Sequence, residues 1–361
     1  MKRATILLTM ILLLSCLLPV GGYYLVLAAQ LQDSAAAVQQ FLTDAAGSAP
    51  LPTAPPESAG QAGSAPSAGS APPSGTEGLA ANTVQVQDTA TGQVLAVPMR
   101  DYILGAVASE MPMTWADAAL QAQAVAVHSY VLYCRDHNDT ASMGGAWLTA
   151  DPARRQGFMT DAVLRSYWGT AYDENYARLS ALVDAVLDTV VLYDNQPAAT
   201  SYFAISNGRT EASQNVWGQA LPYLQSVDSA GDRQAEGYTA QVTYTGQQMY
   251  DALVSNLGIT PDGLAPGQYF GAPRYTDAGY IAEMEVCGVS VQGTVLRSAL
   301  HLRSACFDIA YADGLFTITT YGYGHGVGLS QYGAQSMALA GAGWQEILQH
   351  YFPGTELAQV P

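Results

Sequence analysis

A tract of Gly, Ser, Ala and Pro at residues 47–78 divides this 361-residue chain. The motif Gly-Ser-Ala-Pro occurs three times in it, beginning at Gly47, Gly63 and Gly69. Such a tract has too little apolar mass to form a core and is typical of a flexible linker. We therefore expect a folded domain only after the tract, at residues 84–361, with residues 31–83 as the linker.

An apolar segment precedes the linker. Residues 4–29 are almost wholly apolar, which exceeds the ~20 residues that a bilayer core requires. Lys2 and Arg3 in front of this segment predict a cytoplasmic N-terminus. We expect residues 1–30 to form a cytoplasmic stub and a single-pass signal anchor in the cell membrane, with the C-terminal domain extracytoplasmic. A signal peptide cleaved near Ala28 is the alternative, but its apolar core is usually only about 7–15 residues long.

The charge of the exported part is strongly acidic. Without Lys2 and Arg3 the chain keeps 11 basic residues against 30 acidic ones, a formal net charge of −19. Nucleic acid is a poor partner for such a field. The acidity itself indicates solubility rather than a substrate.

The periodicity after residue 84 predicts an α+β fold with mainly antiparallel strands. Residues 84–87 and 94–97 flank a turn and predict a β-hairpin. Helical patterns cover residues 100–109, 176–190, 246–256, 294–301, 331–341 and 343–351, and strand patterns cover residues 199–206, 238–245, 279–286, 306–311 and 314–320. Residues 235–315 could form an inserted lobe of this domain.

One carboxylate, Glu110, stands in an apolar setting. An apolar run precedes it, and Met111, Pro112 and Trp115 follow. A carboxyl in such surroundings is poorly solvated when charged, so it can stay protonated near neutral pH and donate a proton. The alternative is a Glu at a helix start that only complements the helix dipole.

The helix after Glu110 is expected to have a firm start. Thr114 and Asp117 have the spacing of a capping box, and the helical pattern lasts to about Arg135. Such a helix would give the preceding carboxyl a rigid support.

Two polar, Gly-bearing segments are candidate binding sites. Residues 206–211, Ser-Asn-Gly-Arg-Thr-Glu, follow a strand pattern and could present hydroxyls to a sugar, although a strand-end turn explains them equally well. Residues 322–333 contain five glycines, a costly backbone composition that would let a bulky substrate approach. This segment lacks the lysine of a phosphate-binding loop.

The cysteines leave the disulfide question open. Cys16 follows Leu-Leu-Ser and faintly resembles a lipoprotein box, but the apolar run continues beyond it. The exported part has three cysteines, Cys134, Cys287 and Cys306, so internal pairing is incomplete. A disulfide between Cys287 and Cys306 and a pair of free thiols are equally compatible with the sequence.

A zinc site on the long helix is not supported. Cys134 and His137 share a helical face, but zinc needs about four ligands. His128 lies nine positions before His137 and on the opposite face. A zinc hydrolase that uses Cys134, His137 and a distant ligand remains an alternative with little support.

Several segments in order resemble the stage II sporulation protein D family of peptidoglycan lytic transglycosylases. They are residues 97–112, 119–126, 206–211, 216–218, 221–224, 300–307 and 322–333. The resemblance covers roughly residues 84–356, and the N-terminal anchor and linker also fit that family.

The resemblance implies cleavage of the MurNAc–GlcNAc bond of peptide-stripped glycan strands, with a 1,6-anhydro sugar as product. One carboxylate suffices if the C6 hydroxyl of the substrate attacks C1, whereas most glycoside hydrolases need two. The catalytic Glu of the family falls on Glu110. The substrate-binding positions that we carry over or infer beside it are His128, Ser206, Thr210, Tyr223, His325 and Gln331.

The sequence departs from the family in two places. Many members have Arg where this chain has His128, and some bind zinc in a loop where this chain has Thr149, Arg154 and Arg155. We therefore expect no zinc and no other cofactor. The expected partners are denuded glycan strands, a peptidoglycan amidase and other membrane proteins of forespore engulfment. A non-catalytic enhancer of an amidase is the second interpretation.

Overall fold

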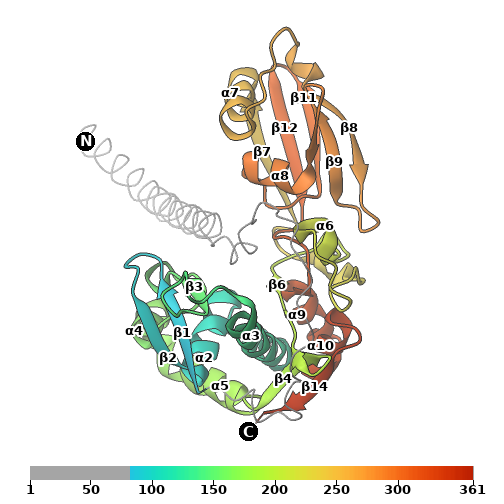
Figure 1. The fold of residues 1–361 in the computed structure, drawn as a ribbon. Coiled ribbons are helices and arrows are strands. Elements are labelled where there is room, and N and C mark those ends of the chain that lie inside the picture. The colour runs from blue at the N-terminus through green and yellow to red at the C-terminus, as the bar shows by residue number, and fades with distance from the viewer. Residues whose placement is uncertain (1–81, 361) are drawn as a thin grey trace, which may run out of the picture. The chain divides into compact units, whose positions relative to one another are not determined.

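The computed structural model describes residues 82–360. The expected membrane anchor, most of the linker and Cys16 lie outside these residues. None of the helices within residues 82–360 has both the length and the apolar character needed to span a bilayer. The described part is a mixed α+β structure in which most strand pairs are antiparallel (Figure 1).

The chain forms the elements in the following order. They are β1 (Thr83–Asp88), β2 (Val94–Pro98), α2 (Met99–Glu110), α3 (Asp117–His137), β3 (Leu148–Ala150), η2 (Pro152–Arg154), α4 (Asp161–Trp168), η3 (Gly169–Ala171), α5 (Tyr172–Asp184), β4 (Thr189–Tyr193), β5 (Gln196–Pro197), β6 (Tyr202–Phe203), α6 (Ser213–Trp217), η4 (Ala230–Gln234), β7 (Thr239–Thr245), α7 (Gly246–Leu257), η5 (Pro266–Gln268), β8 (Phe270–Tyr275), β9 (Ile281–Val286), β10 (Val289–Gln292), α8 (Gly293–Ala299), β11 (Phe307–Ala312), β12 (Leu315–Tyr321), β13 (Leu329–Ser330), α9 (Gln331–Leu339), α10 (Trp344–Tyr351) and β14 (Glu356–Gln359).

The helix α3 is the centre of the first hydrophobic core. It contacts α2, α5, α9, α10 and β4. Its buried face is rich in alanine, as at Ala119, Ala122 and Ala126, and such small side chains let several elements approach one helix closely. The core unites residues from both ends of the described chain, so α9 and α10 pack beside α2 and α3 although more than 190 residues separate them.

Five small sheets complete the fold. Their strand orders are β2-β1-β3, β10-β9-β8, β11-β12-β7, β13-β6 and β14-β4-β5. Among the described strands, β1 with β3 and β13 with β6 pair in parallel, and the other pairs are antiparallel.

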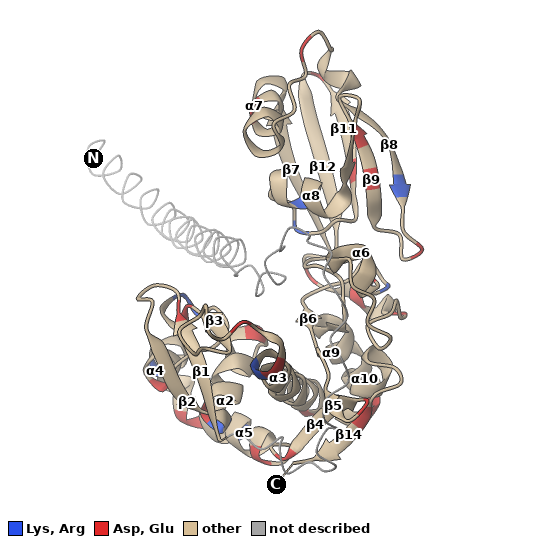
Figure 2. Cartoon of the chain, in the orientation of Figure 1, with Lys and Arg blue, Asp and Glu red and all other residues tan. Residues whose placement is uncertain are grey.

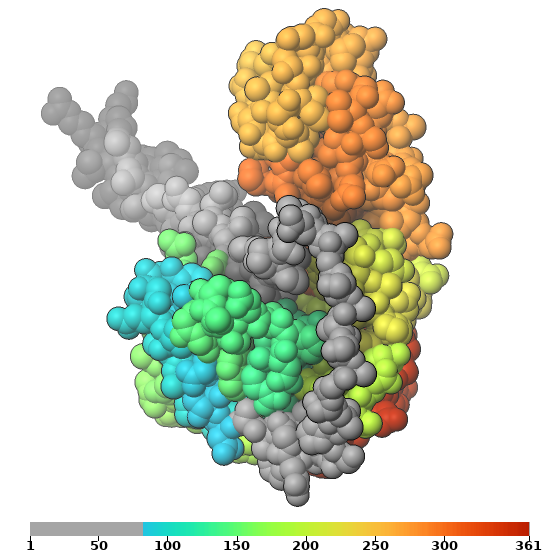
Figure 3. Space-filling model, in the orientation of Figure 1, coloured from blue at the N-terminus to red at the C-terminus, as the bar shows by residue number. Residues whose placement is uncertain are grey.

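Residues 239–321, from β7 to β12, have a hydrophobic core of their own, and we call them the small lobe. Met249, Leu253, Leu296, Phe316 and Ile318 are fully or almost fully buried in it. The helix α7 in this lobe begins with a complete capping box, in which the side chains and backbones of Thr245 and Gln248 bond reciprocally. Figure 3 shows the residues of this lobe in orange as closely packed.

Most expected elements are confirmed, and three expectations are wrong. The expected hairpin is formed by β1 and β2, and Val84 and Val86 are buried. However, α3 begins at Asp117 after Ala116, without any side-chain cap, so Thr114 makes no capping box. The Ala116 N–H group instead donates to Gln335 Oε1 at 2.9 Å.

The other two errors concern element lengths. The helix expected at residues 176–190 is α5, which ends at Asp184, and β4 begins at Thr189. The strand expected at residues 199–206 is reduced to β6, which pairs in parallel with β13.

Candidate active site

Glu110 is the last residue of α2. The next residue, Met111, is extended and buried, and its N–H group donates to the Val107 carbonyl. The carboxylate therefore lies at the negative end of the helix dipole, where a negative charge is unfavourable. The alternative that Glu110 complements a helix start is wrong, because the helix ends here.

Within the described part of the chain, a single side chain donates a hydrogen bond to this carboxyl. Gln331 Nε2 lies 2.9 Å from Glu110 Oε2. Gln331 is buried and is the first residue of α9. Burial raises the pKa of Glu110, and the Gln331 hydrogen bond opposes this shift without cancelling it. Glu110 itself is half-buried, so a proton can be exchanged with a ligand.

Tyrosines interact with the same carboxyl. Burial is the main cause that raises the pKa of Tyr102 and of Tyr202, and the charge of Glu110 is a further cause in both. Both phenols therefore stay neutral at any physiological pH. Tyr102 belongs to α2 itself, whereas Tyr202 is in β6, which pairs with β13 directly before Gln331.

The position of Gln331 depends on a buried carboxyl, Asp232 in η4. Asp232 Oδ2 accepts hydrogen bonds from the Ser206 N–H and hydroxyl groups and from Ser229 Oγ, and Asp232 Oδ1 accepts one from Ser330 Oγ at 2.8 Å. Ser330 is the N-cap of α9, because its hydroxyl also accepts from the Gly333 N–H group. The sequence analysis missed Asp232, since a lone acid in a short 3₁₀ helix carries no pattern.

Two further contacts fix the segment after Glu110 against α9. The rings of Trp115 and Tyr332 meet edge to face with centroids 4.8 Å apart. The bond from Ala116 to Gln335 lies one turn further along α9. The apolar neighbours expected from the sequence are thus held beside Glu110 by residues more than 200 positions away.

The glycines at residues 322–333 serve chain packing. Gly328 has φ of +84°, and a Cβ there would lie 2.2 Å from the Ser201 carbonyl oxygen. At Gly324 a Cβ would lie 2.7 Å from Phe203 Cβ. These glycines therefore allow a close approach of the protein's own chain around β6, and the approach of a substrate to this segment stays a prediction.

Both ring nitrogens of His325 in this segment are hydrogen-bonded to the backbone. Its Nδ1 accepts from the Val327 N–H group at 3.0 Å, so Nε2 carries the proton and donates to the Tyr202 carbonyl at 3.1 Å. Burial, with the Arg297 charge as a smaller cause, lowers the pKa of His325 to about 3. The neutral ring orients the backbone of β6.

The other predicted binding residues are also occupied within the fold. Ser206 bonds Asp232, Thr210 Oγ1 accepts from the Val227 N–H group at 2.8 Å, and Tyr223 Oη accepts from Ala199 N–H at 2.9 Å. All three are buried. The structure brings only Gln331 of the predicted binding residues into contact with Glu110, and a substrate role of the others stays a prediction.

His128 lies on a face of α3 different from that of Tyr130. It interacts with the backbone of Leu187 and Thr189, and burial lowers its pKa to about 4. Tyr130, whose pKa is influenced by Tyr102, is two positions further and about 160° around the helix. His128 thus faces β4, and its Nδ1 has no hydrogen-bond partner among the described residues.

The cysteines have no partners that would form a metal site. In the described part of the chain, no three His, Cys, Asp or Glu residues cluster to hold an ion, and Cys134, Cys287 and Cys306 are free thiols. Burial raises the pKa of Cys134 to about 12, which disfavours the thiolate that zinc requires. The ring of His137 stacks on Tyr133.

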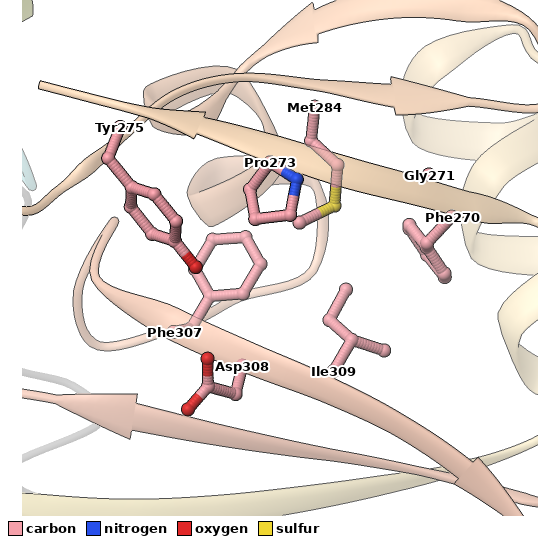
Figure 4. Close-up of a pocket in the computed structure, with 8 residues that line it drawn as sticks. All are labelled: Phe270, Gly271, Pro273, Tyr275, Met284, Phe307, Asp308 and Ile309. Carbon is pink, nitrogen blue, oxygen red and sulfur yellow. The ribbon is translucent and has the colours of Figure 1, made fainter.

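A pocket of about 170 Å³ lies in the small lobe, away from Glu110. It is lined by Phe270, Gly271, Pro273, Tyr275, Met284, Phe307, Asp308 and Ile309 (Figure 4). These residues come from β8, β9 and β11. Asp308 Oδ2 accepts a hydrogen bond from Tyr321, so the acid in this pocket is already bonded.

Known proteins resemble this chain over most of its length. A family model described as "Stage II sporulation protein" matches residues 87–193. Stage II sporulation protein D of Bacillus subtilis is 34% identical over 288 residues, which cover 79% of this chain and 82% of that protein. The same-named protein of Bacillus amyloliquefaciens is 32% identical over 278 residues, 77% of this chain and 79% of that one. An amidase enhancer of Bacillus subtilis is 24% identical over 311 residues, 70% of this chain and 40% of that protein.

Proposed function

Because the chain belongs to the stage II sporulation protein D family, we propose that it is a lytic transglycosylase that cleaves MurNAc–GlcNAc bonds in peptide-stripped glycan strands during engulfment. The observation that carries this proposal is the carboxyl of Glu110. It is half-buried, its pKa is raised by burial, and one neutral amide orients it. A carboxyl in this state can both give and take a proton near neutral pH.

The reaction needs no second carboxylate. Glu110, protonated, donates its proton to the glycosidic oxygen while the bond from that oxygen to C1 of MurNAc breaks. The C6 hydroxyl oxygen of the same sugar attacks C1 and transfers its proton to Glu110. The strand ends are then a 1,6-anhydro-MurNAc and a GlcNAc with a free 4-hydroxyl, no water is consumed, and Glu110 is protonated again.

The Gln331 amide has a definite role in this cycle. Its N–H group donates to one carboxyl oxygen, Oε2, and so leaves the other oxygen to exchange protons with the sugar. An amide donor also supports the transient carboxylate without supplying a full positive charge, which would hold the pKa of Glu110 low.

The variant Glu110→Gln tests this proposal. Purified full-length protein is incubated with peptide-free glycan strands, and the products are separated and weighed by mass spectrometry. Wild type should release anhydro-ended fragments and the variant none. The matched control is Glu346→Gln, which changes an exposed acid at the start of α10 and should retain activity. Equal product from wild type and Glu110→Gln contradicts the proposal.

A second function is favoured by one comparison. The amidase enhancer of Bacillus subtilis aligns with 70% of this chain, so a non-catalytic role beside an amidase is the alternative. The two functions differ in what the protein does alone. Anhydro products from the purified protein without amidase support the transglycosylase, whereas stimulation of an added amidase without such products supports the enhancer.

The proposal also includes the cellular setting. The N-terminal apolar segment would anchor the protein in the membrane, and the linker would let the domain reach the wall. An amidase partner would supply the peptide-free strands. Resistance of the full-length protein to extraction from membranes at high pH tests the anchor.

A further inference from the structure

Two arginines of the small lobe have no acidic partner within residues 82–360. Arg297 is in the last turn of α8, where Figure 2 shows a basic residue in blue, and Arg303 follows in the segment before β11. The Nε atom of each is buried and has no hydrogen-bond partner, and neither side chain forms an ion pair among the described residues. By contrast, Arg100 forms an ion pair in which its Nε lies 2.6 Å from Asp184 Oδ1.

These two partly buried charges lack a counter-charge among the described residues. Guanidinium groups stay protonated in proteins, even where burial lowers their pKa as it does here. Their Nε atoms are buried without a hydrogen-bond partner, and Arg is well suited to bidentate binding of a carboxylate. The two side chains therefore have the properties of an unfilled anion site.

The arginines lie beside the residues that hold Glu110. The Arg303 guanidinium lies 4.3 Å from the centre of the Tyr323 ring and interacts electrostatically with Tyr332. Arg297 also interacts with Tyr323. Tyr332 directly follows Gln331, the donor to Glu110, so the positive charges flank the segment that carries the Gln331–Glu110 pair.

Among the described residues, no carboxylate forms an ion pair with either arginine. Both terminal nitrogens of Arg303 lie 3.4 Å from the place of a Cβ on Gly237, which is exposed, so no side chain from that position covers the guanidinium. The charge of Glu236 influences Tyr332, but Glu236 makes no ion pair with either arginine.

We propose that Arg297 and Arg303 bind the free lactyl carboxylate of a MurNAc residue near the cleaved bond. This inference rests on the proposed function. In intact peptidoglycan the lactyl carboxyl is an uncharged amide to the stem peptide, and removal of the peptide leaves a carboxylate. The arginine pair thus distinguishes stripped glycan from unstripped glycan by charge.

Binding is tested in Glu110→Gln full-length protein, so that no strand is cleaved. The ligands are peptide-stripped glycan strands and the same strands with their lactyl carboxyls converted to methylamides. We expect about tenfold tighter binding of the free carboxylates, by isothermal titration calorimetry. Equal affinity for the two ligands overturns the proposal.

Variants assign the discrimination to these residues. Arg297→Gln and Arg303→Gln should bind both ligands with nearly equal affinity, whereas Arg274→Gln, which alters an exposed arginine paired with Glu283 on β9, should discriminate as before. Retained discrimination in both test variants contradicts the proposal. If they do not fold, Arg303→Lys decides: discrimination should weaken because an ammonium group cannot bind in bidentate fashion, and undiminished discrimination contradicts it.

Turnover by wild type on the free strands is measured separately. Discrimination without turnover contradicts the transglycosylase activity and leaves the carboxylate site standing. Turnover without discrimination contradicts the carboxylate site alone.

Discussion

Glu110 and Asp232 are two carboxyls withdrawn from water that differ in how far hydrogen bonds satisfy them. Asp232 is fully buried and accepts four hydrogen bonds from three serines, whereas the half-buried Glu110 accepts one side-chain bond, from Gln331. Burial raises the pKa of both. Only Glu110 keeps an oxygen free to meet a ligand, so the two differ in function although each resists ionisation.

The two carboxyls are also connected. Ser330 donates to Asp232, and the next residue, Gln331, donates to Glu110. A single peptide at the start of α9 thus joins a structural acid to the proposed catalytic one. Burial raises the pKa of both carboxyls, so burial does not distinguish them. They differ in whether a carboxyl oxygen still has lone pairs that no hydrogen bond occupies.

The largest effect on stability is expected from Asp232→Leu. This change removes the acceptor of four buried hydrogen bonds and should lower the free energy of unfolding by about 3 kcal/mol or more, although the Ser330 and Ser229 hydroxyls keep the Ala204 carbonyl and Tyr351 Oη as partners. Glu110→Leu loses one bond from a half-buried group and should cost no more than about 1 kcal/mol. Urea denaturation measures the free energy of unfolding of both variants. Equal decreases would contradict the distinction between Asp232 and Glu110.

The next effect concerns the donor to Glu110. Gln331→Leu removes the hydrogen bond that lowers the pKa of Glu110, so this pKa should rise further. Activity that needs protonated Glu110 falls as pH rises through this pKa, and the falling limb of the kcat/KM profile should therefore move to higher pH. We also expect a loss of about tenfold at the optimum, from poorer orientation. An unchanged pH profile would contradict the influence of Gln331 on the pKa of Glu110.

The smallest effect is a pH dependence of stability. Because the pKa of Glu110 is raised in the folded state, the folded protein binds more protons than the unfolded chain between the two pKa values. The contribution of Glu110 to the free energy of unfolding is fully present below the ordinary glutamate pKa of about 4.3. It is lost as the pH rises through the raised pKa of the folded state.

Glu110→Gln should therefore lose less stability than wild type as the pH rises from 4 to 8. Chemical denaturation of both proteins across this range measures the difference. Parallel curves would mean that the pKa of Glu110 is the same in the folded and unfolded states.

The features that depend on a local residue pattern could be predicted from the sequence. Alternating valines specified the first hairpin, and the apolar neighbours Met111 and Trp115 correctly indicated a carboxyl with a raised pKa. Glu110 and Gln331 were both named, but their contact joins residues 221 positions apart and has no local signal.

The errors have the same origin. The backbone group at the start of α3 is satisfied by Gln335, from the far end of the chain, so the local cap at Thr114 was unnecessary. The first two residues of β4 were included in a helix because residues 189–192 are all buried, and a short continuous apolar run does not distinguish strand from helix. Asp232 and the unpaired Arg297 and Arg303 are defined only by their three-dimensional neighbours.

The most direct test of the central claim is a titration of the Glu110 carboxyl. Protein labelled with ¹³C at glutamate carboxyls is followed by NMR from pH 3 to 9, and Glu110→Gln identifies the resonance. The account predicts a midpoint clearly above the ordinary value of about 4.3. A midpoint at or below that value would contradict it, because the carboxyl would then have no proton to give at neutral pH.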